Sequence, residues 1–257
     1  MLEIIKKSSL DNEKLSQIKE ITNNNQLDSF DFSEAVVKKP WGYEYIAYSS
    51  EEISAWILHI KKDNLTSMHC HVLKKTALIV LSGKAVCSTL DKSYELSEGQ
   101  GLIFDKGVFH STKAISDNGI ILIELESPSK KTDLVRLNDS YGRETKGYEL
   151  QNEMCFDLSE YERVYFKKED ISLQKRIGNM NLCIRDFIDT YSLQAHLKAN
   201  RGTLLIILSG EIFNEKNDEI LVTGHELRIL HSQDAEHIKI KQPVKTLSIY
   251  TNILDFD

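Results

Sequence analysis

The sequence predicts an all-β fold made of two small jelly-roll barrels with a helix in front of them. From Val36 onward, short segments rich in Val, Ile, Leu, Tyr and Thr alternate with Gly, Asn, Asp and Ser, a pattern typical of sandwiches and barrels. The stretch "LIVLSGKA" at Leu78–Ala85 returns as "LLIILSGEI" at Leu204–Ile212, which indicates an internal repeat. The chain of 257 residues is long enough for two such units, each with its own core.

One helix is expected before the strands. Leu10, Leu15, Ile18 and Ile21 recur at a loose helical spacing among polar residues, and the pattern ends in "NNN" near Asn25. The predicted organisation is a helical extension (1–35), a first barrel with the candidate site (36–145), a polar connection (146–170) and a degenerate second barrel (171–257).

Eight strands are expected in the first barrel. They are Glu44–Ser49, Ser54–Lys61, Thr66–Val72, Ala77–Leu81, Lys84–Leu90, Gly101–Phe104, His110–Ala114 and Ile120–Glu126. The chain then becomes polar from Ser127 to Asp170, and we interpret this stretch as a connection.

The second half keeps only part of the histidine set that forms the candidate site of the first half. Aligning the glycines of the repeat places His196 at the position of His69 and replaces His71 by Lys198. Of that set, only His196 and at most His237 have counterparts in the second half. We therefore expect the second barrel to bind no metal and to serve in packing or dimerisation. A homodimer through strand edges is one expectation, and two barrels that satisfy each other within one chain is the alternative.

Composition excludes several classes of protein. The net charge of -7 and a pI near 5.7 argue against a nucleic-acid groove, so the pairs Lys38-Lys39 and Lys130-Lys131 are expected on the solvated surface. The four cysteines form no CxxC pair and are expected to be reduced and mostly buried. We find no signal peptide and no apolar run of ~18 residues, so a cytoplasmic location without membrane contact is expected.

Three histidines form a candidate metal site. His69 and His71 alternate with Cys70, so on a strand both imidazoles point to the same face. A turn at Gly107 would bring His110 back across the sheet beside them. Three imidazoles can hold a divalent metal, with Zn the first choice and Fe, Mn, Ni or Cu as alternatives.

This arrangement resembles the two motifs of the cupin family. His69, His71 and Gly83 match the first motif, and Gly99, Gly107 and His110 match the second. Three positions depart from the pattern: Asp63 replaces the leading glycine, Asp105 replaces a proline, and Thr76 replaces the metal-binding glutamate. The resemblance therefore implies a three-histidine site without its usual carboxylate.

Within the cupins, residues 36–143 resemble the cupin domain of type II mannose-6-phosphate isomerases. The stretches that carry the resemblance are "KKPWGYEY" at Lys38–Tyr45, "LIVLSGKA" at Leu78–Ala85 and "DLVRLNDSYGR" at Asp133–Arg143. The resemblance implies a sugar phosphate as substrate. It also implies a metal that polarises a sugar oxygen while a base moves a proton between C1 and C2.

That chemistry suggests roles for specific residues. The candidate catalytic residues are Glu124, Glu126 and Lys75, and both glutamates are equally well interpreted as rim carboxylates. The candidate substrate-binding residues are Lys106, Arg136, Arg143 and Trp41. Arg136 or Arg143, in the stretch Asp133–Arg143 (the tail), could instead hold the tail to the barrel by pairing with Asp133 or Asp139. Trp41 could fill the core.

Three functions remain open at this point. The first is a metal-dependent isomerase or epimerase acting on a sugar phosphate or nucleotide sugar, in carbohydrate or cell-surface polysaccharide metabolism. The second is a non-catalytic bicupin that binds a sugar or another small metabolite. The third is an iron dioxygenase, because three histidines without a carboxylate resemble the thiol dioxygenase type of cupin.

Overall fold

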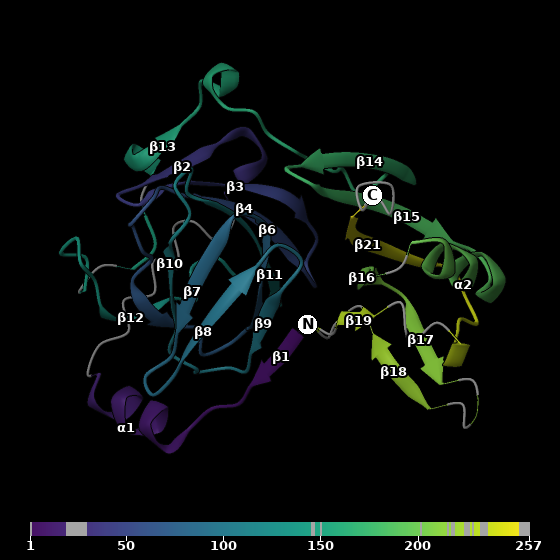
Figure 1. The fold of residues 1–257 in the computed structure, drawn as a ribbon, viewed down its shortest axis with the longest axis horizontal. Helices are drawn as coiled ribbons and strands as arrows, with labels where there is room; N and C mark the ends of the chain where they lie inside the picture. The colour runs from purple at the N-terminus through teal and green to yellow at the C-terminus, as the bar shows by residue number, and fades with distance from the viewer. Residues whose placement is uncertain are drawn as a thin grey trace.

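The computed structural model describes residues 2–18, 30–144, 147–149, 151–200, 202–214, 216, 219–223, 227, 229–231 and 236–251. Strands dominate these residues (Figure 1). The helices described are α1 (Ser9–Gln17) and α2 (Thr190–Ala199), with short 3-10 turns at Phe32–Glu34, Gln151–Glu153 and Leu158–Glu160. The predicted all-β class is confirmed.

The first unit is a barrel of three sheets. Its strands are β1 (Leu2–Ile5), β2 (Val36–Lys39), β3 (Gly42–Ser49), β4 (Ser54–Ile60), β5 (Met68–Cys70), β6 (Lys75–Ser82), β7 (Lys84–Ser88), β8 (Ser93–Ser97), β9 (Gly101–Phe104), β10 (Ser111–Ala114), β11 (Ile120–Ser127), β12 (Val135–Asn138) and β13 (Met154–Cys155). The large sheet has the order β1-β9-β6-β11-β4-β3-β2-β13, and the smaller sheets are β10-β7-β8 and β12-β5.

The second unit repeats this strand order. Its strands are β14 (Ser172–Ile177), β15 (Met180–Phe187), β16 (Leu204–Ser209), β17 (Glu211–Asn214), β18 (Ile220–Thr223), β19 (Ile229–His231), β20 (Ile238–Lys239) and β21 (Val244–Thr251). The order β14-β15-β21-β16-β19 mirrors β3-β4-β11-β6-β9, and β18-β17-β20 mirrors β8-β7-β10. The repeat seen in the sequence therefore extends to the pairing of the strands.

The repeat fails between β15 and β16, where the first unit has the histidine strand β5. The second unit has helix α2 in this place, capped by the Asp189 side chain, which accepts from the Ser192 backbone N–H (2.7 Å). Leu193 and Leu197, one turn apart, are fully buried. The expectation that His196 lies on a strand equivalent to that of His69 is wrong. His196 is buried in α2, with its Nε2 3.1 Å from the Ser248 hydroxyl.

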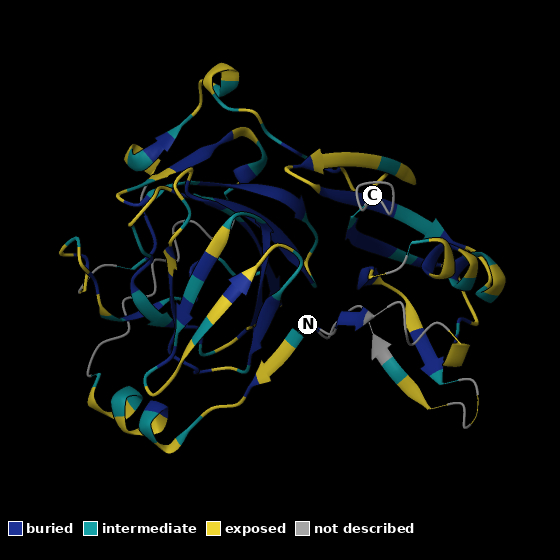
Figure 2. Cartoon of the chain, viewed as in Figure 1, coloured by how far each residue is buried: buried dark blue, intermediate teal, exposed yellow. Residues whose placement is uncertain are grey.

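Both faces of the large sheet are buried (Figure 2). Residues such as Trp56, Leu58 and Leu122 face the barrel interior, while Ile57 and Ile123 face outward. This explains the uninterrupted apolar runs of β4, β6 and β11, which an exposed outer face would not tolerate.

The outward face meets the second unit. One core cluster contains Ile57, Ile79 and Ile123 of the first unit together with Leu182 and Ile206 of the second. The two units thus share an apolar core within one chain, and they lie side by side in Figure 1.

The N-terminal extension is tied to the barrel at two points. Strand β1 pairs in parallel with β9, although no strand was expected there. The Asp11 carboxylate of α1 is buried and accepts from the Phe109 backbone N–H (3.0 Å). The predicted helix is present, and its expected continuation through Ile21 to Asn25 lies outside the described residues.

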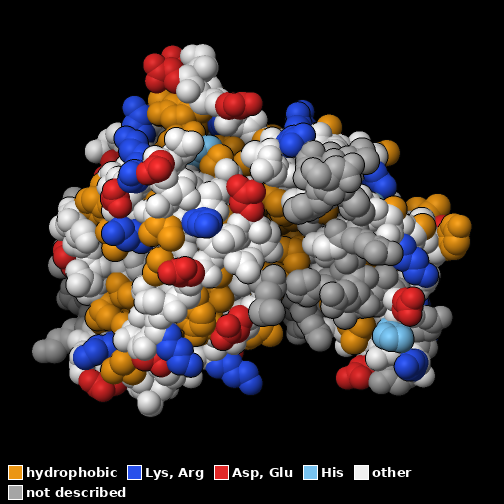
Figure 3. All heavy atoms as spheres, viewed as in Figure 1, with side chains coloured by type: hydrophobic (Ala, Val, Ile, Leu, Met, Phe, Trp, Pro, Cys, Tyr) orange, Lys and Arg blue, Asp and Glu red, His pale blue; other side chains and the backbone are white. Residues whose placement is uncertain are grey.

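The charged side chains on the surface and the state of the cysteines agree with what the composition predicts. On the face drawn in Figure 3, basic and acidic side chains are interspersed. Cys70, Cys87 and Cys183 are buried, Cys155 is half-buried, and all four are free thiols as expected. Among the described residues, no helix has the length and apolar character needed to cross a membrane.

Candidate metal centre

Backbone pairing brings the three histidines together. His69 and His110 form an antiparallel bridge, with reciprocal N–H to carbonyl bonds of 3.0 and 2.8 Å. Gly107 makes the turn before His110 at φ +79°, and its N–H donates to the His71 carbonyl (2.6 Å). The sequence prediction that a turn at Gly107 returns His110 to the histidine strand is confirmed.

Each imidazole donates its Nδ1 proton to a backbone carbonyl. The acceptors are Ser67 for His69 (2.8 Å), Asp133 for His71 (2.5 Å) and Val108 for His110 (3.0 Å). A carbonyl oxygen can only accept, so Nδ1 carries a proton in each ring, and Nε2 is the nitrogen that a neutral ring offers to an ion. The Nε2 atoms of His71 and His110 are buried without a hydrogen-bond partner, as expected of atoms placed to bind an ion.

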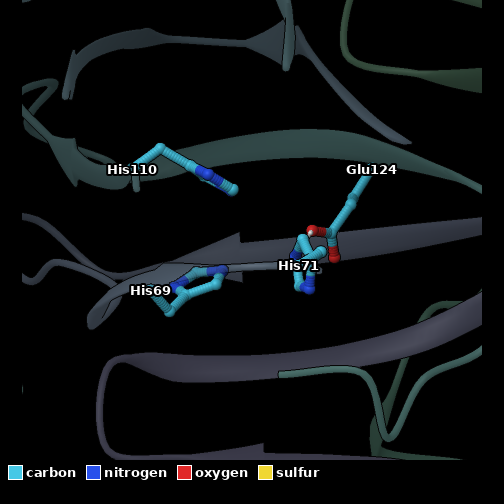
Figure 4. A group of neighbouring side chains, drawn as sticks. All are labelled: His69, His71, His110 and Glu124. Atoms are coloured by element: carbon cyan, nitrogen blue, oxygen red, sulfur yellow. Dashed lines mark ion pairs between the residues drawn. The ribbon is translucent and has the colours of Figure 1, made fainter. Parts of the chain in front are cut away.

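Glu124 is the fourth member of the group. It comes from β11, and its ligand atom and those of the three histidines lie within 4.8 Å of one another (Figure 4). Its Oε1 lies 3.8 Å from Nε2 of His71. The expectation of a site without a carboxylate is therefore wrong, because Glu124 supplies one from another strand. Thr76, at the family's glutamate position, is buried with its hydroxyl unpartnered.

Burial keeps two of the histidines neutral. It lowers the pKa of His110 to about 4, with His71 adding to the effect. The pKa of His69 falls well below its usual value because of burial and its two histidine neighbours. Burial alone would raise the pKa of Glu124, but Lys131 and His71 outweigh it, so the carboxyl is ionised. At neutral pH the group thus offers imidazole lone pairs and a carboxylate, the forms that bind metals.

A buried ion-pair network adjoins this group. Lys131 contacts Glu124 (3.2 Å), Glu126 (3.3 Å) and Glu44 (3.3 Å), and its ammonium lies 4.0 Å from the centroid of the Trp56 ring. These carboxylates outweigh the effect of burial and raise the pKa of Lys131.

Glu126 is also held by Lys74 at 2.8 Å and by the Ser54 hydroxyl at 3.2 Å. Burial opposes ionisation, but Lys131 and Lys74 lower the pKa of Glu126.

Arg136 and Arg143 of the tail, together with Tyr148, line the buried space beside the metal group, which is called the chamber from here on. Arg143 pairs with Asp139 (2.7 Å), four residues earlier in the same tail. Arg136 and Arg143 also bind Glu149, at 2.9 and 2.7 Å, and Lys39 contacts the same carboxylate. The Tyr148 hydroxyl donates to Glu44.

The expectation that the pairs Lys38-Lys39 and Lys130-Lys131 lie on the solvated surface is wrong for Lys39 and Lys131. The side chains of Lys39 and Lys131 are 4% and 9% exposed, because both are buried in ion pairs.

The predicted site residues separate into two groups. His69, His71, both glutamates, Arg136, Arg143 and Trp41 line one cavity, and His110 joins them through the metal group. Lys75 and Lys106 do not lie there: Lys75 is 46% exposed and pairs with Asp105 (3.2 Å), and Lys106 is exposed. The cavity has a volume of about 50 Å³. That holds one or two waters, each of which takes roughly 30 Å³ in the liquid.

The sequence did not identify Lys39, Lys74, Lys131 and Tyr148 as residues that line this cavity, or Glu149 as their neighbour. In the fold, the Asp133 carboxylate accepts from the backbone N–H groups of Val72, Leu73 and Lys74 and fixes the turn before β6. No local pattern in the sequence marks any of these five residues.

A second, larger pocket of about 470 Å³ is lined by Phe32, Tyr165, Trp56 and Lys131, among others. Lys131 therefore borders both spaces.

Comparisons with known proteins give partial likenesses. No protein-family model matches the chain. The xanthan biosynthesis protein XanB of Xanthomonas campestris pv. campestris (strain B100) is 28% identical over 137 residues, which are 51% of this chain and 29% of XanB. The chain thus spans less than a third of the length of the curated relatives it matches.

Several solved structures are similar to part of the chain. KdgF from Halomonas sp. is 17% identical with a TM-score of 0.36, over 40% of this chain and 92% of that one. The capsular polysaccharide assembling protein CapF from Staphylococcus aureus is 16% identical with a TM-score of 0.37, over 40% and 32%. A sugar phosphate isomerase of the cupin superfamily from Silicibacter pomeroyi is 12% identical with a TM-score of 0.32, over 40% and 73%.

Proposed function

We propose that this chain is a metal-dependent protein of carbohydrate metabolism that acts on a sugar phosphate or nucleotide sugar in an isomerase-like or epimerase-like reaction. The observation that carries the proposal is the convergence of three imidazoles and the Glu124 carboxylate on one buried point. Two of the Nε2 atoms there have no other partner. Leaving such atoms unsatisfied costs about 1–3 kcal/mol each, which a bound ion would offset.

The residues present fit a divalent ion. Three nitrogens and one carboxylate oxygen suit Zn²⁺, and Mn, Fe or Ni accept the same donors. A metal held there would polarise a carbonyl or hydroxyl oxygen of the sugar. The proposed proton-transfer group is Glu126, a carboxylate of the same chamber that does not belong to the metal group.

Non-catalytic binding is the second candidate, and one observation favours it. Glu126 is fixed by Lys74, Lys131 and Ser54, and its pKa is lowered. A general base works best with a pKa near the working pH, so a carboxylate held in this way is a poor base. The iron dioxygenase hypothesis rested on the missing carboxylate, and Glu124 removes that premise.

Turnover separates the two candidates. We expect purified, metal-loaded protein to interconvert an aldose phosphate and a ketose phosphate, and His71→Ala to abolish this activity. Glu126→Gln should lower kcat by about 100-fold or more if Glu126 moves the proton. Tight binding of the same sugar phosphates without turnover would favour the binding protein instead.

A further inference from the structure

A second constellation lies beside the metal group: one carboxylate held by three cations. Oε1 of Glu149 accepts from Nη2 of Arg136 (2.9 Å) and Nη1 of Arg143 (2.7 Å), and Lys39 contacts Oε2. The side chains of all four residues are at most 7% exposed. Two guanidinium groups and an ammonium converging on a few oxygens form the arrangement that proteins use for phosphate.

Each of the three cations also has a contact other than Glu149. Arg143 is held through two bonds to Asp139, at 3.0 Å from Nε and 2.7 Å from Nη2. Lys39 ends strand β2 and lies 3.3 Å from Glu44. Arg136 lies on β12, paired in register with His69, and its Nη1 donates to the Gly147 carbonyl. Lys39 and Arg136 are therefore carried by strands of the first unit.

The Glu149 carboxylate, in contrast, lies in a segment without regular secondary structure. Gly147–Glu149 lies in neither a helix nor a strand, and Tyr148 beside it is buried against Glu44 and the Lys39 ammonium, which lies 4.1 Å from the centroid of its ring. The three cations line the same cavity of about 50 Å³ as His69 and His71. With its side chains placed as they are, this space is too small to enclose a sugar.

We propose that Lys39, Arg136 and Arg143 form the subsite for the phosphate group of the ligand, and that Glu149 occupies this subsite in the ligand-free protein. The inference rests on the proposed function, since it names how a phosphorylated ligand is held beside the metal group. Phosphate replaces the Glu149 carboxylate on the same three donors, and withdrawal of Glu149 with Tyr148 opens the chamber. The larger pocket is less suited to a phosphate, because its further lysines, Lys130 and Lys168, are half-buried and exposed.

Inorganic phosphate binding to the metal-free protein tests the subsite. Calorimetry at constant ionic strength would compare wild type with Glu149→Ala and Glu149→Gln, using acetate as the comparison anion. We expect phosphate to bind Glu149→Ala at least about tenfold more tightly than wild type, because the internal competitor is gone. Adding Arg143→Gln to Glu149→Ala should remove the gain. Glu144→Ala, which removes an exposed carboxylate from the same tail, should bind phosphate as wild type does.

If Glu149→Ala folds poorly, its thermal unfolding with and without phosphate tests the subsite instead. Phosphate should then raise its Tm by more than it raises that of wild type or of Glu144→Ala. If neither Glu149 variant gains phosphate affinity or phosphate-dependent stability, the subsite is overturned. An equal gain for acetate would overturn its assignment to phosphate. If the subsite is overturned but wild type still turns over a sugar phosphate, the proposed function stands. Failure of the subsite and failure of the proposed function are thus distinguishable.

Discussion

Each imidazole of the metal group has its direction set by the acceptor of its Nδ1 proton. For His71 this acceptor is the carbonyl of Asp133, which belongs to the tail motif and not to the histidine strand. Such outer contacts fix the tautomer and aim the second nitrogen, and their loss typically costs about 10–100-fold in metal affinity. The tail is therefore part of the metal site although it supplies none of the four ligand atoms.

Removing the Glu124 carboxylate should weaken metal binding. We expect Glu124→Gln to lower the affinity for Zn²⁺ by at least about tenfold, because one anionic donor is lost and Lys131 loses a partner. Competition with a chelating dye measures the affinity. Glu95→Gln, on an exposed position of β8, serves as the control and should match wild type. Wild-type affinity in Glu124→Gln would show that Glu124 is not a ligand.

The sequence could identify the histidines but not the carboxylate. HxH spacing and the turn at Gly107 are local features, so they can be recognised in one dimension. Glu124 reaches the group only through the register of β11 with β6, in which Glu124 faces Leu78 and Glu126 faces Thr76. Pairing register depends on the whole sheet, so the carboxylate was sought on β6, where Thr76 stands.

The Asp133 carboxylate joins the tail to the turn before β6. It accepts from the N–H groups of Val72, Leu73 and Lys74 at 2.8–3.1 Å. Asp133→Ala should lower the free energy of unfolding by about 1–3 kcal/mol or more, because buried donors lose their acceptor. Urea denaturation checks this. Asp105→Ala removes a surface ion pair with Lys75 and should cost at most about 1 kcal/mol. Equal losses would contradict the assigned role.

Acid should loosen the segment that carries Glu149. Burial alone would raise the pKa of this carboxyl, but Lys39, Arg136 and Arg143 lower it to about 2, against 4.5 for an ordinary glutamate. Its stabilising contribution is full above pH 4.5 and disappears as the pH falls toward 2, with an upper limit of about 3 kcal/mol.

The pH dependence of stability of a variant measures this contribution. Glu149→Gln should lose stability at pH 7 and show a shallower decline between pH 4.5 and 2 than wild type. Unfolding in urea at a series of pH values gives both curves. Parallel curves for the two proteins would mean that Glu149 does not titrate as the structure implies.

Strands were far easier to predict than the helix of the second unit. Gly101–Phe104 matches β9 in both bounds, and Ile120–Glu126 misses β11 by one residue. Helix α2 carried its own signals, an Asp189 cap followed by Leu193 and Leu197 one turn apart. The repeat alignment placed a strand there instead, because a duplicated fold can replace one of its elements while its other pairings persist.

For the whole molecule, the shared core should make the two units unfold together. Leu182 of β15 is fully buried in the cluster that includes Ile57 and Ile123 of the first unit. Leu182→Ala should cost about 2–5 kcal/mol, as for other large-to-small core changes.

The two tryptophans, Trp41 and Trp56, both lie in the first unit. Their fluorescence therefore shows whether a change in the second unit affects unfolding of the first. Their fluorescence should follow a single transition that Leu182→Ala shifts to lower urea. Ile188→Ala, on a side chain that is 74% exposed, should leave the midpoint unchanged. A tryptophan transition unaffected by Leu182→Ala would indicate two independent units.

Composition and periodicity revealed two β units but not how they meet. A homodimer through strand edges and two barrels that satisfy each other within one chain were both consistent with the sequence. In the structure, the chain's own second unit covers the outward face of the large sheet. Contacts of this kind join positions far apart in sequence, such as Ile57 and Leu182, and no local pattern records them.

Metal quantification on protein purified without a histidine tag tests the metal group. The geometry predicts close to one divalent ion per chain in wild type, retained through gel filtration and lost in His71→Ala. Wild-type protein that stays metal-free after incubation with Zn²⁺, Mn²⁺, Fe²⁺ and Ni²⁺, or that holds as much metal as His71→Ala, would exclude a metal site at these residues.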